Sequence, residues 1–201
     1  MAERITDTEL AERLGLIESM IAEGRRTTEH WSWTFVLWGV AYLVAIAWSA
    51  WGPSPVFAWP VTMVAASIAT ALLMSRDREK TPETTLGRAL GSIWIALAVT
   101  MFVVFAALGF SGRIGDVHVF VSIACGLLGL ANAASSMMLR WKVQFAAAVG
   151  WWTASVLGCF GSANQSLVVF VAAVFLCQIV FGIYGMMCEA RERKQRGTVH
   201  A

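Results

Sequence analysis

Two amides are the polar side chains that stand out inside the long apolar stretches of this chain, Asn132 and Gln178. A polar group in hydrocarbon is costly and is a default functional candidate. Small residues lie at helical spacing from both, namely Cys125, Gly129 and Ser136 for the first and Gly182 and Gly185 for the second. This pattern predicts close helix packing with an amide hydrogen bond across the interface. The alternative is an intramembrane polar site in which Asn132, Gln178 and Trp152 line a path.

A short segment between two apolar stretches, residues 111–118, gathers three ionisable side chains, Arg113, Asp116 and His118. Asp116 is placed to cap a helix that begins at residue 117. One Asp and one His are too few for a metal site, which needs three or four ligands. We therefore expect a solvated outer rim, with a sensing or ligand-binding rim as the alternative, and we predict neither a metal nor a cofactor.

Motifs for catalysis are missing from the sequence. We find no nucleophile paired with a base, no glycine-rich phosphate loop and no HExxH motif. The four cysteines form no CxxC pair, so no disulfide framework is expected. The sequence therefore predicts a protein that is not an enzyme.

The distribution of charge shows which elements must position these side chains. The chain has 201 residues, of which 58% are hydrophobic and 14% charged, with a mean hydropathy of +0.65. No Asp, Glu, Lys or Arg occurs in four blocks, 31–75, 89–112, 117–139 and 143–188. A membrane crossing takes about 20 residues, so the blocks predict an all-α bundle of six transmembrane helices. Soluble multidomain enzymes, nucleic-acid binders, secreted disulfide scaffolds and outer-membrane barrels are disfavoured.

Turn residues divide the two longest blocks, at Trp51-Gly52-Pro53-Ser54-Pro55 and at Gly161-Ser162-Ala163-Asn164-Gln165. The transmembrane domain, 31–188, is then expected to contain six spans, about 31–51, 55–75, 88–109, 117–138, 142–160 and 165–188. Fourteen of the 15 basic residues fall on one side of these spans, and basic residues are retained in the cytoplasm. We therefore expect a multi-pass protein of the bacterial inner membrane with both termini, including a basic 189–201 tail, in the cytoplasm.

Two further patterns concern the spans. The segments that follow Val56-Phe57, Val119-Phe120 and Val169-Phe170 each reach an arginine after one crossing, which suggests three repeated helical hairpins; the alternative is that topology alone produces this likeness. Six tryptophans are expected to anchor the interfaces, with Trp31, Trp33 and Trp141 on the inner side and Trp48, Trp51 and Trp59 on the outer side.

Residues 1–30 predict an amphipathic cytoplasmic helix. Thr6 and Glu9 form a capping box, and an apolar stripe follows at Leu10, Leu14, Ile17 and Ile21. Seven acidic against four basic side chains give the segment a net charge of −3, whereas helices that lie on membranes are normally basic. The stripe is therefore expected to bind a protein surface, which is either the chain's own basic segments or another chain.

The run Ile21-Ala22-Glu23-Gly24-Arg25-Arg26-Thr27-Thr28-Glu29, followed by Trp33-Thr34-Phe35-Val36-Leu37-Trp38-Gly39, resembles a group of uncharacterised small bacterial integral membrane proteins with an amphipathic leader and six spans. The resemblance extends over most of the chain and implies the same fold. It carries no activity and no site residues. Such proteins look like partners encoded beside transcriptional regulators or transport operons.

Together these observations favour a non-catalytic interaction or regulatory subunit that contacts a partner protein or a second copy through its N-terminal helix. Two alternatives stay open: a transporter or channel for a small neutral or apolar solute, and a cofactor- or pigment-binding subunit of a larger membrane complex. The expected partners are the lipid bilayer and a protein, and not nucleic acid.

Overall fold

The computed structural model describes residues 12–16, 19, 31–78 and 85–199, and throughout these ranges the regular structure is helical. The elements are α2 (Ser32–Trp51), the short 3-10 helix η1 (Pro55–Phe57), α3 (Ala58–Arg78), α4 (Thr85–Phe110), α5 (Val117–Leu139), α6 (Lys142–Leu157), α7 (Ala163–Val174), the π-helix η2 (Phe175–Val180) and α8 (Phe181–Val199). In the described chain, five helices are long and apolar enough to cross a membrane. The all-helical, multi-pass architecture is thus confirmed.

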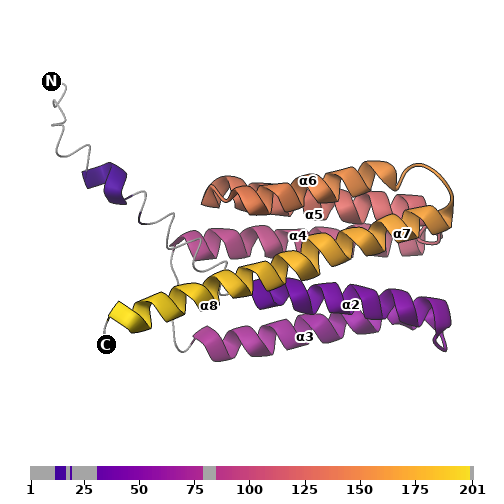
Figure 1. Ribbon diagram of the computed structural model, residues 1–201. Coiled ribbons are helices and arrows are strands. Elements are labelled where there is room, and N and C mark those ends of the chain that lie inside the picture. Colours follow the sequence, from indigo (N-terminus) through magenta and orange to yellow (C-terminus); the bar gives the residue numbers. More distant parts are fainter. Residues whose placement is uncertain (1–11, 17–18, 20–30, 79–84, 200–201) are drawn as a thin grey trace, which may run out of the picture.

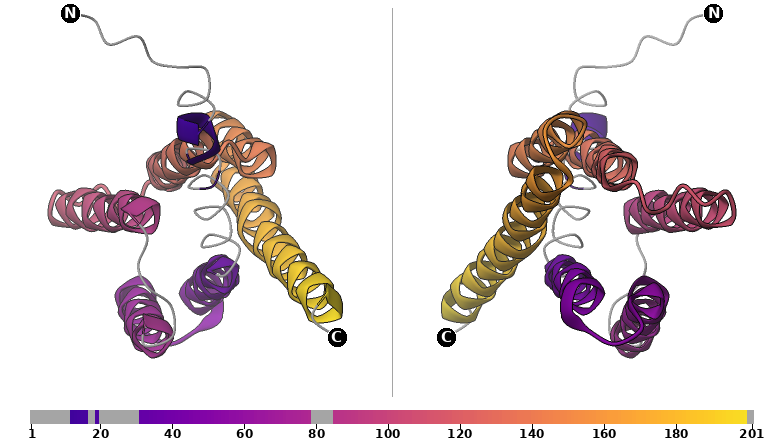
Figure 2. Two further views of the ribbon diagram at one scale, coloured as in Figure 1. Left: turned by 90° about the vertical axis from the view of Figure 1, so that its left-hand side faces the viewer. Right: turned by 90° about the vertical axis from the view of Figure 1, so that its right-hand side faces the viewer.

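From α2 to α7 the helices run alternately toward one end of the bundle and back (Figure 1), and the long C-terminal helix crosses the others obliquely (Figure 2). The segments α7, η2 and α8 are continuous and make one long helix that extends beyond the ends of its neighbours. The residues expected to form a tail therefore remain helical as far as Val199. Helix α6 lies beside α5 and returns the chain to the opposite end of the bundle (Figure 1), although with 16 residues it is shorter than the other five.

The most extensive helix pair is α5 with α6. This pair joins the second and third predicted hairpins instead of lying within one of them, so the threefold repeat stays a prediction. Helix α4 stands to one side of the bundle (Figure 2) and packs mainly on α5. Helix α2 packs on α3 and on the long C-terminal helix.

Aromatic rings from different helices pack on one another. One cluster joins five of them through Tyr42, Trp59, Phe105, Phe120 and Phe170, with neighbouring ring centroids 4.7 to 6.5 Å apart. We call it the central aromatic cluster. Trp59 is partly buried, and its ring meets Phe120 edge-on; its role as an outer anchor stays a prediction.

A second aromatic contact corrects the expectation for Trp141. This side chain is buried and packs on Phe181, with 5.3 Å between ring centroids, so it is not an interfacial anchor. Trp51, by contrast, is exposed at the outer turn, as an anchor should be.

Glycines allow the closest helix contacts. A Cβ atom added to Gly182 on α8 would lie 2.9 Å from the Ser32 carbonyl oxygen of α2, and Gly185 faces the Ser32 side chain. Gly129 on α5 lies under the ring of Trp152 on α6. The small residues that flank Asn132 and Gln178 in the sequence are thus used for close packing, as their spacing predicts.

The two predicted turns are confirmed, with small shifts in the helix ends. In the first, Ser54 adopts a left-handed conformation at φ 53°. In the second, Gly161 does so at φ 83°. Helix α7 begins at Ala163, earlier than expected, because Ser162 and Gln165 form a capping box. Helix α6 ends at Leu157, earlier than expected, because the chain turns from Gly158 onward.

Candidate functional site

The outer rim is built on the first turn of α5. The Asp116 side chain accepts hydrogen bonds from the backbone N–H groups of His118 (3.0 Å) and Val119 (3.4 Å), so the predicted N-cap is confirmed. A carboxylate is favourable at this position because it satisfies free N–H groups and complements the helix dipole. Arg113 is exposed in the preceding loop. Asp116 therefore has a structural role as the N-cap of α5.

His118 joins the outer ends of three helices. Its Nδ1 atom lies 2.9 Å from the carbonyl oxygen of Gly158, which caps α6, and 2.9 Å from Oγ of Ser166 on α7. Ser166 Oγ lies in turn 3.0 Å from the same Gly158 oxygen. The last carbonyls of a helix lack intrahelical partners. Side chains from α5 and α7 therefore satisfy the C-terminal end of α6.

The His118 and Ser166 pair has the separation of a nucleophile and its base, but the wrong hydrogen-bond arrangement for that chemistry. The Gly158 oxygen can only accept, so a hydrogen bond from His118 to it requires the tautomer with the proton on Nδ1. A base would instead have to accept the serine proton. Ser166 is also fully buried. The pair consequently links the outer ends of α5, α6 and α7.

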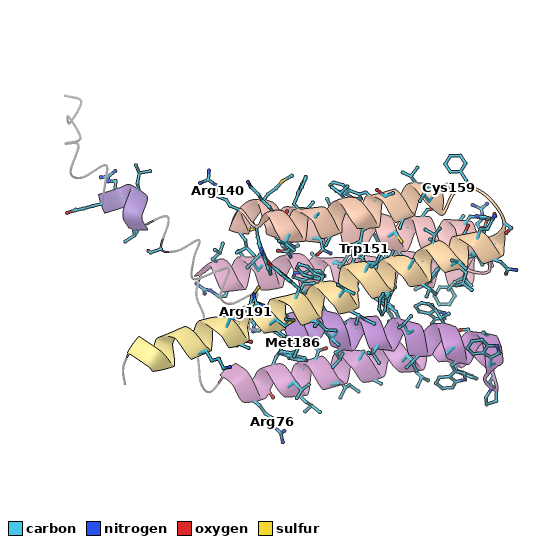
Figure 3. The ribbon with its side chains drawn as sticks, viewed as in Figure 1. Arg76, Arg140, Trp151, Cys159, Met186 and Arg191 are labelled. Atoms are coloured by element: carbon cyan, nitrogen blue, oxygen red, sulfur yellow. The ribbon has the colours of Figure 1, made fainter. Side chains whose placement is uncertain are left out.

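A further polar contact lies next to this junction. Ser155 on α6 donates to the Ser122 carbonyl of α5 at 2.7 Å, and Ser122 Oγ lies 3.1 Å from the thiol sulfur of Cys159. Cys159 is exposed at the end of the bundle opposite to Arg76, Arg140 and Arg191 (Figure 3).

The three residues of the expected intramembrane site contact different neighbours. Gln178 is buried in η2 and lies close to Gly39 of α2. A Cβ atom added to Gly39 would lie 3.1 Å from the Cβ atom of Gln178. Trp152 covers Gly129 and is 37% exposed. Asn132 is fully buried on α5 and donates from Nδ2 to the Leu128 carbonyl of its own helix at 2.9 Å. The Asn132 amide group thus makes a hydrogen bond within α5 instead of the expected hydrogen bond between helices.

Gln178 lies within the π-helix η2, which could not be predicted from the sequence. A π-helix inserts an extra residue in a turn and often accompanies a functional position. The Oε1 atom of Gln178 is buried and has no hydrogen-bond partner in the described part of the chain.

Sequence reasoning missed several buried polar residues. Ser166, Ser135 and Gln144 are fully buried. Of the two adjacent tryptophans on α6, Trp151 and not Trp152 belongs to the buried core. Figure 3 shows Trp151 in the interior of the bundle. A signal existed for Gln144, which is an amide inside a charge-free block. The burial of Ser166 had no local signal, because its partners outside its own helix turn, Gly158 and His118, lie 8 and 48 residues away.

Of the predicted N-terminal stripe, only Leu14 falls within the described residues. Its side chain is 55% exposed, in a helical segment at 12–16. The other three positions, Leu10, Ile17 and Ile21, and the Thr6 and Glu9 capping box, lie outside the described residues.

No group of three metal-ligating side chains occurs within the described ranges. No family model, no curated protein and no solved structure matches the chain.

Proposed function

We propose that this protein is a non-catalytic interaction or regulatory subunit of the bacterial inner membrane, and that the apolar stripe on its N-terminal helix binds a partner protein or a second copy of the chain. The apolar stripe of the N-terminal segment carries the proposal, and its one residue in the described part of the chain, Leu14, is exposed. An apolar side chain on a predicted helix stripe is left uncovered by the rest of the described chain, and such a stripe is stable only when it is buried against something.

The arrangement of the bundle supports a binding role over transport or catalysis. The central aromatic cluster links five helices through ring contacts, and the outer-rim residues Asp116, His118 and Ser166 are used for helix ends. These groups hold the bundle together, so the N-terminal stripe remains as the surface for an external contact.

The charge of the N-terminal segment favours a protein as its partner. Residues 1–30 carry a net −3, and an anionic lipid surface repels an acidic helix. A protein with a basic cytoplasmic surface matches both the apolar stripe and its charge. The resemblance to small bacterial membrane proteins that look like operon partners agrees with this proposal.

We also propose that α6 is a sixth span and that both termini are cytoplasmic. The end of α5 and the start of α7 lie at opposite ends of the bundle (Figure 1), so the connecting helix has to cover its length. Arg76, Arg140 and Arg191 lie at one common end (Figure 3), which the positive-inside rule assigns to the cytoplasm. The three-hairpin repeat is compatible with this topology.

Cys159 tests this topology. If α6 crosses the membrane, a membrane-impermeant maleimide added to intact spheroplasts should label Cys159, which is exposed at the outer end. The buried Cys125 and Cys177 should not react. A Cys159→Ser variant should lose the label, which mass spectrometry of the digested protein would show. Labelling of Cys188 from outside, with Cys159 protected, would contradict the proposed orientation.

Replacement of Leu14 tests the binding role. A Leu14→Glu variant should lose the complex or oligomer that native mass spectrometry detects after gentle release from the cell's own membrane. A buried apolar anchor contributes about 2 kcal/mol or more to an interface, which corresponds to a roughly 30-fold weaker affinity.

Leu16 provides the matched control. It belongs to the same helical segment and is 64% exposed, but at 3.6 residues per turn it points away from the stripe. A Leu16→Glu variant adds the same charge and should keep the complex. If both variants or neither variant lost it, the stripe would not be the binding surface.

A further inference from the structure

The C-terminal end of α8 continues past the apolar part of its helix. The membrane-length apolar stretch of this helix ends at Arg191, whereas the helix itself continues to Val199 and reaches beyond the ends of its neighbours (Figure 1). At about 1.5 Å per residue, this extension adds roughly 12 Å, which exceeds the headgroup layer of about 5 to 8 Å on each side of a bilayer. The end of α8 therefore leaves the lipid and is accessible to a protein.

One face of this helix end is exposed and changes from apolar to basic. Met187, Ala190 and Lys194 lie three or four residues apart, which places them on one face of α8. All three are exposed, as is Arg191. Four basic against two acidic side chains give residues 189–199 a net charge of +2. An apolar turn beside basic side chains fits an acidic amphipathic partner.

The N-terminal segment has the complementary composition. Residues 1–30 carry a net charge of −3, and Leu14 belongs to their apolar stripe. Glu12 and Leu14 are both exposed in the single chain. The helical segment at 12–16 lies apart from the end of α8 in different views (Figures 1 and 2). The chain's own α8 thus does not cover this stripe at Leu14, and a second copy can supply its α8 instead.

The two complementary surfaces begin at the same place in the fold. The N-terminal segment leads directly into α2, which starts at Ser32. Gly185, just before the exposed end of α8, packs against the Ser32 side chain. Each copy therefore presents an acidic and a basic surface side by side. Surfaces arranged in this way can pair reciprocally about a two-fold axis, so that the same contact forms twice.

We propose that two copies of this chain form a dimer in which the basic end of α8 of one copy binds the acidic N-terminal segment of the other. The inference rests on the proposed binding role of the N-terminal stripe and identifies its partner. The stripe is buried against Met187 and Ala190, and the acidic side chains beside it face Arg191 and Lys194.

Charge reversal on full-length chains tests the contact. One chain, the N-reversed chain, carries Glu9→Lys and Glu12→Lys, and the other, the C-reversed chain, carries Arg191→Glu and Lys194→Glu. Wild-type copies with two different affinity tags should co-purify after gentle extraction from the membrane. Each reversed chain should co-purify with itself at least about tenfold less, because like charges then meet.

Co-expression of the N-reversed chain with the C-reversed chain should restore co-purification to the wild-type level. In this mixed dimer a basic surface meets an acidic one in both contacts. Restored pairing also shows that both variants fold. Arg113 is exposed in the outer loop, and an Arg113→Glu chain, as the control, should pair with itself like the wild type.

Three results would overturn the dimer. If wild-type copies did not co-purify, α8 would be covered by its own chain, by lipid or by another protein. If each reversed chain paired with itself like the wild type, or if co-expression restored nothing, the two segments would not be in contact. The Leu14→Glu variant separates this inference from the proposed function. Loss of the native complex in Leu14→Glu, with full pairing of the reversed chains, would keep the stripe as a binding surface and overturn only its contact with α8.

Discussion

Replacement of Gly182 by Leu should destabilise the bundle by about 3 kcal/mol, at the upper end of the usual cost of overpacking. A Cβ atom at this position would lie 2.7 Å from Val36 Cγ2 and 2.9 Å from the Ser32 carbonyl oxygen. The second of these is a backbone atom, so a rotamer change cannot relieve the clash. The long C-terminal helix would have to move away from α2.

That movement would also weaken neighbouring contacts. Phe35 and Phe181 meet edge-on with their ring centroids 5.1 Å apart, and Gly185 lies against the Ser32 side chain. Thermal unfolding in detergent should show a lower Tm. The buried thiols of Cys125 and Cys177 should react faster with a maleimide dye on heating, because the core that covers them opens earlier.

Gly91 provides the control for this substitution. It lies in α4, and a Cβ atom added there would meet nothing within 4 Å. Leu is a better helix former than Gly at both positions, so Gly91→Leu should leave the Tm unchanged or raise it. If both variants were equally stable, the close contact of α8 with α2 would not contribute to folding.

The positions of the helices could be predicted from the sequence because charge is so costly in a bilayer. Charge-free blocks and turn residues located α2, α3, α4 and α5 to within a few residues. Asp116 was predicted as a cap because the preference depends on neighbouring residues alone. Both features follow from local chemistry.

Which helices pair could not be predicted in the same way. Lipid is as apolar as a helix face, so hydrophobic periodicity does not identify the partner. Thus the pairing of α5 with α6 and the contact of Trp59 with Phe120 had no local signal. The position of His118 beside Gly158, 40 residues away in sequence, likewise depends on how the helices pack.

The same argument applies to the polar residues. Amides and hydroxyls in the spans can be recognised from the sequence as costly, but their partners depend on helix rotation and register. At the outer end, His118 and Ser166 satisfy the end of α6. Nearer the basic end, Ser135 and Gln144 are left without protein partners in the described residues. Polar residues of similar type therefore have different roles at the two ends of this bundle.

The adjacent tryptophans of α6 allow packing and polarity to be separated. Trp151 is fully buried, while Trp152 is partly exposed above Gly129. A Trp151→Ala variant should lose about 3 kcal/mol of stability, because removal of a fully enclosed aromatic side chain leaves a cavity. Trp152→Ala should lose less, because part of its surface is already uncovered. Denaturant titration in mixed micelles measures both.

A third variant, Trp151→Phe, shows what the indole N–H contributes. Nε1 of Trp151 is buried and has no hydrogen-bond partner among the described residues. Its removal therefore relieves a desolvation cost of about 1 to 3 kcal/mol, which offsets the smaller volume of the phenyl ring. Trp151→Phe should be close to wild type in stability while Trp151→Ala is not. If both variants were equally destabilised, the indole N–H would have to be making a hydrogen bond in the membrane, and the role of Trp151 would be polar as well as steric.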